Sequence, residues 1–169
     1  MDLTATAQDN AIEPQRRIIL SQYHLAVNEA TRDSPQESGL VNNGWYGKFH
    51  LEMVLWHLGH RARWGKWSIL DRTLPGLYER FLPTSKQRAR EQGYTGARWG
   101  KMSDPTGRSA PGEINSLLIW QQPHPFYFAE MEYTEFPTEQ TLEKWDEILT
   151  ESAEFMTSFA WWNSSTGTT

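Results

Sequence analysis

The 169-residue chain contains no cysteine, so disulfide bonds and thiolate chemistry are excluded, and cysteine usage gives no guide to the redox compartment. Long apolar stretches are also missing, because no run approaches the roughly 18 apolar residues that a membrane span requires. The first ten residues, MDLTATAQDN, have neither the basic start nor the apolar stretch of a secretory signal. We therefore expect a cytoplasmic chain as written, without a membrane partner; secretion of a longer parent protein stays open.

An excess of positive charge is absent as well. The chain has 16 Lys and Arg against 21 Asp and Glu, a net charge of −5, and the basic residues are scattered among the acidic ones. Nucleic acids are bound by clustered basic residues, so this charge pattern argues against a nucleic-acid partner. His57 and His60 lie three residues apart, but no third ligand follows at a suitable spacing. We expect neither a metal ion nor another cofactor.

Aromatic residues, in contrast, are abundant. Nine Trp, seven Phe and six Tyr make up 13% of the chain, which is more than an unfolded polar chain carries. These rings either build a core or line a concave site whose flat apolar faces meet a ligand such as a sugar. The length favours a single domain or a piece of a larger one.

No segment shows the alternating pattern of a strand, whereas apolar residues recur at helical spacing, so the predicted class is all-α. Pro75-Gly76 should break the third helix, Pro83 should restart it with a cap at Thr84 or Ser85, and Gly93 should end it. The last helix should be capped by Thr138. Its apolar stripe is predicted at Leu142, Trp145, Leu149, Ala153 and Met156. The predicted helices span residues 14–32, 48–65, 66–82 with its continuation from 83, 115–135 and 138–162.

The order of the predicted helices suggests two layers. Amphipathic helices alternate with the segments 48–60 and 115–133, which are apolar on most sides and read as buried inner helices. Such alternation is typical of a toroid of helical hairpins, in which the long loops before the inner helices form a bowl at one rim. We expect a flexible segment at 1–13, the helical domain at 14–162 and a frayed tail at 163–169.

Three motifs carry a resemblance to a known family: NNGWYGKFHLEM from Asn42, GARWGKM from Gly96 and LLIWQQPHPFYFAEMEY from Leu117. In this order they resemble the six-hairpin glycosidase-like proteins, and the resemblance runs from about Gln15 to Trp162. The resemblance implies an (α/α)6 toroid and an activity like that of glycoside hydrolases or phosphorylases, including the α-L-fucosidase and maltose phosphorylase branches. It also implies a general acid in a loop before an inner helix and a general base on a later hairpin.

The family toroid has twelve helices, whereas this chain supplies about five or six, or about two and a half hairpins. We therefore expect a partial toroid that lacks the general base and is inactive alone, as a fragment or relative of a glycoside hydrolase. Such an open arc should self-associate through its exposed surfaces. The alternative is a non-catalytic all-α module that binds a carbohydrate or a protein.

Two carboxylates are candidates for the general acid. Glu113, in APGEINS, directly precedes a predicted inner helix, where an aromatic bowl could keep it protonated near neutral pH. Its alternative role is a helix N-terminal carboxylate, which the helix dipole favours. Asp104, in KMSDP, is the competing acid, and its alternative role is an Asx-turn before Pro105.

Sugar-binding residues are predicted around these acids. The resemblance implies that Lys48 and His50 hold the sugar, although Glu52 could equally pair with Lys48 at i,i+4. Trp45 and Trp99 are candidate stacking platforms.

Several further residues have two readings each. Trp120 is also a candidate platform, but core packing explains it equally well. Arg98 and Lys101 suit hydroxyl or carboxylate binding, or else a salt bridge at the rim of the bowl. The polar side chains of a buried helix need partners, and sugar hydroxyls would be one set; the residues concerned are Gln121, Gln122 and His124.

Overall fold

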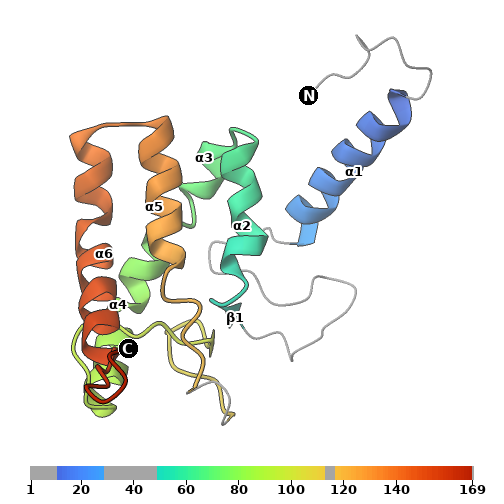
Figure 1. Cartoon of the computed structure of the whole chain (residues 1–169). Coiled ribbons are helices and arrows are strands. Elements are labelled where there is room, and N and C mark those ends of the chain that lie inside the picture. Colours follow the sequence, from blue (N-terminus) through green and yellow to red (C-terminus); the bar gives the residue numbers. More distant parts are fainter. Residues whose placement is uncertain (1–10, 29–48, 113–116, 169) are drawn as a thin grey trace.

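The computed structural model describes residues 11–28, 49–112 and 117–168 (Figure 1). Within these ranges the regular secondary structure is helical apart from one pair of two-residue strands, which confirms the all-α class. The helices are α1 (Ile12–Asn28), α2 (Val54–Arg63), α3 (Trp67–Leu70), α4 (Gly76–Glu91), α5 (His124–Glu135) and α6 (Glu139–Phe159). The strands are β1 (Phe49–His50) and β2 (Met102–Ser103).

The core lies where α2, α4, α5 and α6 meet, and much of it is aromatic. Tyr78 of α4 packs edge-on against Trp99, with ring centroids 5.0 Å apart, and lies 6.4 Å from the ring of Trp145 on α6. Phe81 and Phe128 are also fully buried. Rings of this size dominate the energy of a core. Only part of the aromatic content is used in this way, because Trp56, Trp120 and Trp161 are among the rings that stay exposed.

Helix α6 begins as predicted but turns a different face inward. The Oγ1 of Thr138 accepts the backbone N–H of Thr141, which confirms the predicted N-cap. The predicted stripe is wrong at three of its five positions, because Leu142, Ala153 and Met156 are exposed. The polar residues Thr141 and Ser152 can lie on the buried face of α6 because each has a hydrogen-bond partner. The buried residues of α6 are Thr141, Trp145, Ile148, Ser152 and Phe155.

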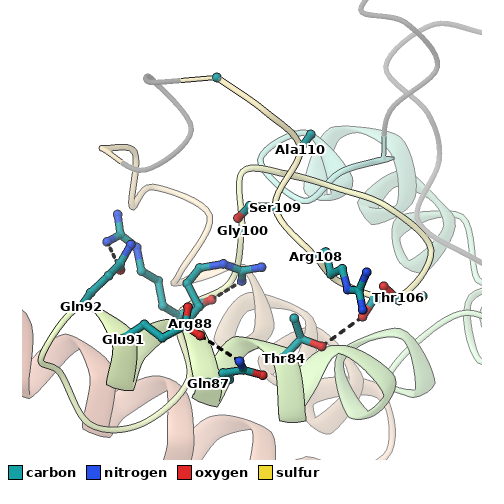
Figure 2. A pocket seen from close by; sticks show the side chains of 12 residues that line it. Thr84, Gln87, Arg88, Glu91, Gln92, Gly100, Thr106, Arg108, Ser109 and Ala110 are labelled. Atoms are coloured by element: carbon teal, nitrogen blue, oxygen red, sulfur yellow. Dashed lines mark hydrogen bonds between the residues drawn. The ribbon is translucent and has the colours of Figure 1, made fainter.

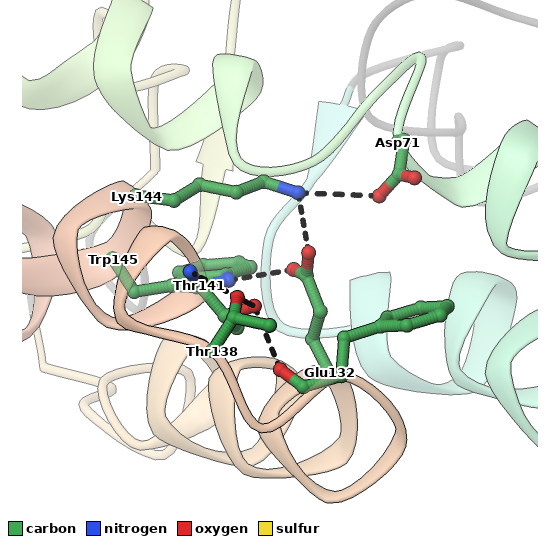
Figure 3. Close-up of polar contacts among 7 residues, drawn as sticks. Asp71, Glu132, Thr138, Thr141, Lys144 and Trp145 are labelled. Atoms are coloured by element: carbon green, nitrogen blue, oxygen red, sulfur yellow. Dashed lines mark hydrogen bonds and ion pairs between the residues drawn. The ribbon is translucent and has the colours of Figure 1, made fainter.

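A polar network fastens α5 to α6 and to the turn after α3 (Figure 3). Glu132 on α5 accepts from Lys144 Nζ at 2.5 Å and from Trp145 Nε1 at 2.7 Å. The same lysine lies 3.3 Å from Asp71. Burial alone would lower the pKa of Lys144, but the hydrogen bonds and charges of Glu132 and Asp71 outweigh it and raise that pKa.

Helix α4 confirms the predicted break and corrects the predicted restart. The helix begins at Gly76, directly after Pro75, and Gly93 follows its end with φ +84°, which glycine adopts without strain. The helix does not restart at Pro83, because α4 runs through that residue without interruption. Pro83 is exposed, so water can reach the backbone carbonyl that loses its partner one turn earlier.

The two predicted inner helices start later than expected. Phe49 and His50 pair with β2 instead of opening a helix, so α2 begins at Val54, and α5 begins at His124. Leu51 and Val54 are buried, as an inner helix requires. Full burial on all sides is wrong, however, because Trp56 on α2 is 64% exposed. On α5 the aromatic residues Phe126, Tyr127 and Tyr133 are also exposed.

Helix α1 stands apart from the other helices (Figure 1). It covers most of the predicted segment 14–32, but none of its residues is buried, and Ile19 and Tyr23 are exposed on its apolar side. In the described residues, no helix combines the length and the apolar character that crossing a membrane would require. At the other end of the chain, Asn163 and Thr168 form an isolated antiparallel bridge.

Candidate functional site

The β1–β2 pairing brings two sequence motifs together. His50 pairs with Met102 in an antiparallel register, and the backbone N–H of Glu52 donates to the carbonyl of Lys101 at 3.5 Å. The backbone therefore places Glu52, from the first motif, beside Lys101, from the second. We refer to His50, Glu52, Lys101 and Trp120 as the Glu52 cluster.

Glu52 is the centre of this cluster. Its Oε1 lies 3.1 Å from Lys101 Nζ and 3.5 Å from His50 Nδ1. Its Oε2 accepts a hydrogen bond of 3.0 Å from Trp120 Nε1. The sequence had indicated Glu52 only as a partner for Lys48, so its central place was missed. The sequence did contain a signal for Glu52, because this carboxylate lies between the apolar Leu51 and Met53. A carboxylate that is buried in such a segment seldom lacks a charged or hydrogen-bonding partner.

The Glu52–Lys101 pair is buried, with each side chain only 9% exposed. Burial lowers the pKa of His50, and the charge of Lys101 acts in the same direction, whereas Glu52 opposes them. His50 is thus neutral near pH 7, and the cluster holds one negative and one positive charge. A buried ion pair contributes little net stability compared with apolar residues of similar size.

Trp120 is the exposed member of the cluster. Its ring is 61% exposed although its N–H is held by Glu52, so the interpretation as core packing is wrong. It lies in the segment before α5, next to other exposed apolar surface at Leu117. A fixed indole with an open face is the arrangement that stacking against a flat ligand requires.

Gln121 and Gln122 are buried directly behind Trp120 in the sequence. Both Nε2 groups donate to the carbonyl of Trp99, at 2.8 and 3.0 Å, which fixes the orientation of both amides. Neither Oε1 atom has a hydrogen-bond donor among the described residues. An unpaired buried acceptor is costly, so a ligand hydroxyl or a water molecule is the natural partner for each.

His124 links the start of α5 to the segment between β1 and α2. Its Nδ1 lies 3.0 Å from the carbonyl oxygen of Leu51 and must donate to it, because a carbonyl can only accept. Burial lowers the pKa of His124, so the ring is neutral near pH 7. This contact positions the segment that carries Glu52.

Trp99 and Arg98, two of the predicted sugar-binding residues, are engaged in contacts outside the Glu52 cluster. Trp99 is fully buried and its Nε1 donates to Ser152 Oγ at 2.9 Å, so, contrary to the prediction, its ring offers no face to a sugar. Arg98 donates to Gln92 and lies over the rings of Phe155 and Phe159, away from the Glu52 cluster.

Asp104 has the geometry of its alternative role. Its Oδ1 accepts from the backbone N–H groups of Thr106 and Arg108 and from the Thr106 hydroxyl, which is an Asx-turn. The Thr106 hydroxyl is the main reason that the pKa of Asp104 is lowered. A general acid needs the opposite shift.

Glu113, Lys48 and Trp45 lie outside the described residues. Within the described ranges, no three His, Cys, Asp or Glu side chains gather in a way that could hold a metal ion. The chain matches no protein-family model, no curated protein and no solved structure.

Proposed function

We propose that this chain recognises a carbohydrate at the Glu52 cluster and is a fragment or relative of a glycoside hydrolase of the six-hairpin type. The observation that carries the proposal is Trp120, an exposed ring whose N–H is fixed by a buried carboxylate. Sugar sites combine such an apolar platform with a few well-placed polar groups. The three family-like motifs support the proposal, because two of them supply Glu52 and Lys101 and the third supplies Trp120.

Each part of the cluster has a role in this proposal. The C–H face of a sugar ring packs on the indole of Trp120, and a hydroxyl at its edge donates to Oε2 of Glu52. Lys101 holds the carboxylate of Glu52 in place through their ion pair. Gln121 and Gln122 are buried behind Trp120 and hold the carbonyl of Trp99, which supports the segment that carries the platform.

Hydrolysis is the further part of the proposal, and Glu113 remains the proposed general acid. Glu52 is neutralised by Lys101 and Asp104 has a lowered pKa, so neither suits proton donation. An inverting mechanism also needs a second carboxylate, roughly 6.5–9.5 Å from the first. In the proposed partial (α/α)6 arc that base comes from another hairpin, and the chain alone binds sugar without cleaving it.

The second candidate is a non-catalytic binding module. It is favoured by the engagement of Glu52 and Asp104 in fixed contacts, which suits binding and leaves no described acid poised to protonate a glycosidic oxygen. Both candidates predict sugar binding at Trp120, and they differ only in whether Glu113 acts on the bound sugar.

The binding proposal is tested by calorimetric titration with a panel of monosaccharides and oligosaccharides. The Trp120→Ala variant should weaken the tightest binding about 10-fold, or about 1.4 kcal/mol. Trp56→Ala is the matched control, because Trp56 is as exposed as Trp120 but has no part in the cluster. Equal affinities for both variants and the unchanged chain would contradict the proposal.

A separate assay distinguishes the two candidates. Aryl glycosides and oligosaccharides are incubated with the chain and with a complete enzyme that contains it. Turnover that falls about 10²–10⁴-fold in Glu113→Gln, while binding persists, identifies the hydrolase. Turnover that Glu113→Gln leaves unchanged contradicts the proposed acid.

A further inference from the structure

A second pocket, separate from the Glu52 cluster, lies against helix α4 (Figure 2). It has a volume of about 610 Å³ and is bounded by the second half of α4 and by parts of the segment 98–112. Arg98 and Gly100 line it, whereas the next residue, Lys101, pairs with Glu52. The segment 98–112 therefore contributes Arg98 and Gly100 to the pocket and Lys101 to the Glu52 cluster.

The pocket is rich in positive charge. Three guanidinium groups line it, from Arg88, Arg98 and Arg108, against the single carboxylate of Glu91. This is notable in a chain whose net charge is −5. Asp104 does not line the pocket but adds a second negative charge close to Arg108, so three positive charges stand against two negative ones. The balance around the pocket remains positive.

The hydrogen bonds of Arg88 go to neutral acceptors, and Glu91 offsets only part of the positive charge around it. The Nη1 of Arg88 donates to the carbonyl of Arg98 at 2.8 Å and its Nη2 to the carbonyl of Gly107 at 2.6 Å. Burial lowers the pKa of Arg88, and the charge of Arg98 lowers it further. Arg88 and Arg98 therefore concentrate positive charge at the pocket, and a bound anion would reduce the repulsion between them.

The pocket wall is also rigid in part. A Cβ atom at Gly100 would lie 3.3 Å from the guanidinium of Arg88, so the backbone of this glycine packs directly on that group. On the other side, Thr84 Oγ1 donates to the carbonyl of Thr106 at 3.1 Å and ties the loop to α4. Hydroxyl and amide groups, including Thr84, complete the lining.

We propose that this pocket binds the oxyanion group, carboxylate or phosphate, of a small hydroxylated ligand through the exposed Arg108, while the buried Arg98 contributes positive charge. Guanidinium groups bind such oxyanions with two parallel hydrogen bonds, and Arg88 adds positive charge from beneath. The volume suits a ligand the size of one or two sugar units. The hydroxyl and amide groups of the lining match the hydroxyls of such a ligand. This site is independent of the function proposed for the Glu52 cluster.

The proposal is tested by following amide resonances of the full chain by NMR during titration with four probes. These are inorganic phosphate, glucuronate, glucose 6-phosphate and glucose. The three anions should shift resonances of α4 and of the segment 98–112, and glucose should not. Similar shifts with glucose, or no shifts there with any anion at tens of millimolar, would overturn the proposal.

Two exposed arginines provide a matched pair of variants. Arg108→Gln removes a pocket charge, whereas Arg90→Gln removes a charge from an exposed position on α4 that does not line the pocket. We expect Arg108→Gln to weaken anion binding by at least about 5-fold and Arg90→Gln by less than about 2-fold. Equal losses would mean that only net charge matters and would refute a built site.

The two anion sources are distinguished by the affinities themselves. Tighter binding of glucose 6-phosphate than of free phosphate assigns a phosphorylated ligand, and tighter binding of glucuronate than of either phosphate assigns a carboxylated one. Circular dichroism checks that the Arg108→Gln variant is folded, and Arg108→Lys retains the charge as a second variant. Arg108→Lys keeps the charge but lacks the guanidinium, so it should bind the anions more weakly than the unchanged chain; full binding in Arg108→Lys would contradict recognition by two parallel hydrogen bonds.

Discussion

Replacement of Lys101 by Met should destabilise the protein strongly, because it leaves the buried carboxylate of Glu52 without its cation. The two side chains are each 9% exposed and their charged atoms lie 3.1 Å apart. Removing one partner of a buried ion pair costs about 3–5 kcal/mol. The hydrogen bond from Trp120 remains and should place the loss towards the lower end of that range.

The loss can be measured by urea denaturation followed by circular dichroism. With a denaturant slope of about 2 kcal/mol/M, a loss of about 3 kcal/mol lowers the midpoint by about 1.5 M. Lys66→Met is the control, since Lys66 is exposed and its replacement should change stability by less than about 0.5 kcal/mol. A cost below about 1 kcal/mol for Lys101→Met would refute the burial of the pair.

The double variant Glu52→Leu/Lys101→Met separates stability from function. With both charges gone, no ion is left buried alone, so stability should return to within about 1 kcal/mol of the unchanged chain. Sugar binding should nevertheless be lost, because the carboxylate that accepts hydroxyls is absent. A double variant that is stable and still binds sugar would show that Glu52 takes no part in recognition.

Three further predictions concern the fold. Lys144→Met should cost about 1–3 kcal/mol by urea denaturation, because it leaves the largely buried Glu132 without its cation, whereas Asp71→Asn at the exposed end of the network should cost less than about 1 kcal/mol; similar costs would contradict the network. Burial lowers the pKa values of His50, His57, His60 and His124, so the unfolded chain binds more protons, and the free energy of unfolding should fall as the pH drops below about 6.5. A pH-independent free energy of unfolding between pH 7 and 5 would contradict this. Gly65→Ala, at φ +63° with open space around it, should cost about 1–2 kcal/mol. Gly96→Ala should cost clearly more, because its Cβ would lie 2.3 Å from backbone atoms of Glu151 and Phe155, and equal thermal midpoints for the two variants would refute that packing.

Features that depend on neighbouring residues could be predicted from the sequence. The cap at Thr138, the break at Pro75 and the helix end before Gly93 each follow from the chemistry of one residue and its immediate context. Helical spacing likewise gave the class and the approximate positions of most helices.

Features that depend on distant contacts were missed. The pairing of β1 with β2 joins residues about fifty positions apart in strands of only two residues, too short to show alternation. The buried face of α6 was misassigned because Ser152 is buried as the acceptor of Trp99, a partnership that periodicity cannot reveal.

The candidate site shows the same division. Lys101, Gln121, Gln122 and His124 were predicted from their residue types, and His50 from the family resemblance. They lie near one another through contacts with Glu52, Trp99 and Leu51. Glu52 was not recognised as their centre, because its partners come from three separate segments. Trp99 was assigned wrongly and Trp120 was left open between platform and core, because a tryptophan in a loop can belong to a core or to an exposed face and only the fold decides.

The most direct test of the central claim follows the indole N–H resonance of Trp120 by ¹H–¹⁵N NMR while sugar is added. The resonance is assigned by its absence in Trp120→Phe. Because this N–H donates to Glu52, a sugar that stacks on the ring and shares that carboxylate should shift the resonance saturably, with the affinity found by calorimetry. The indole resonance of Trp56 should stay unchanged. A sugar that binds the chain but leaves the Trp120 resonance in place would contradict the account.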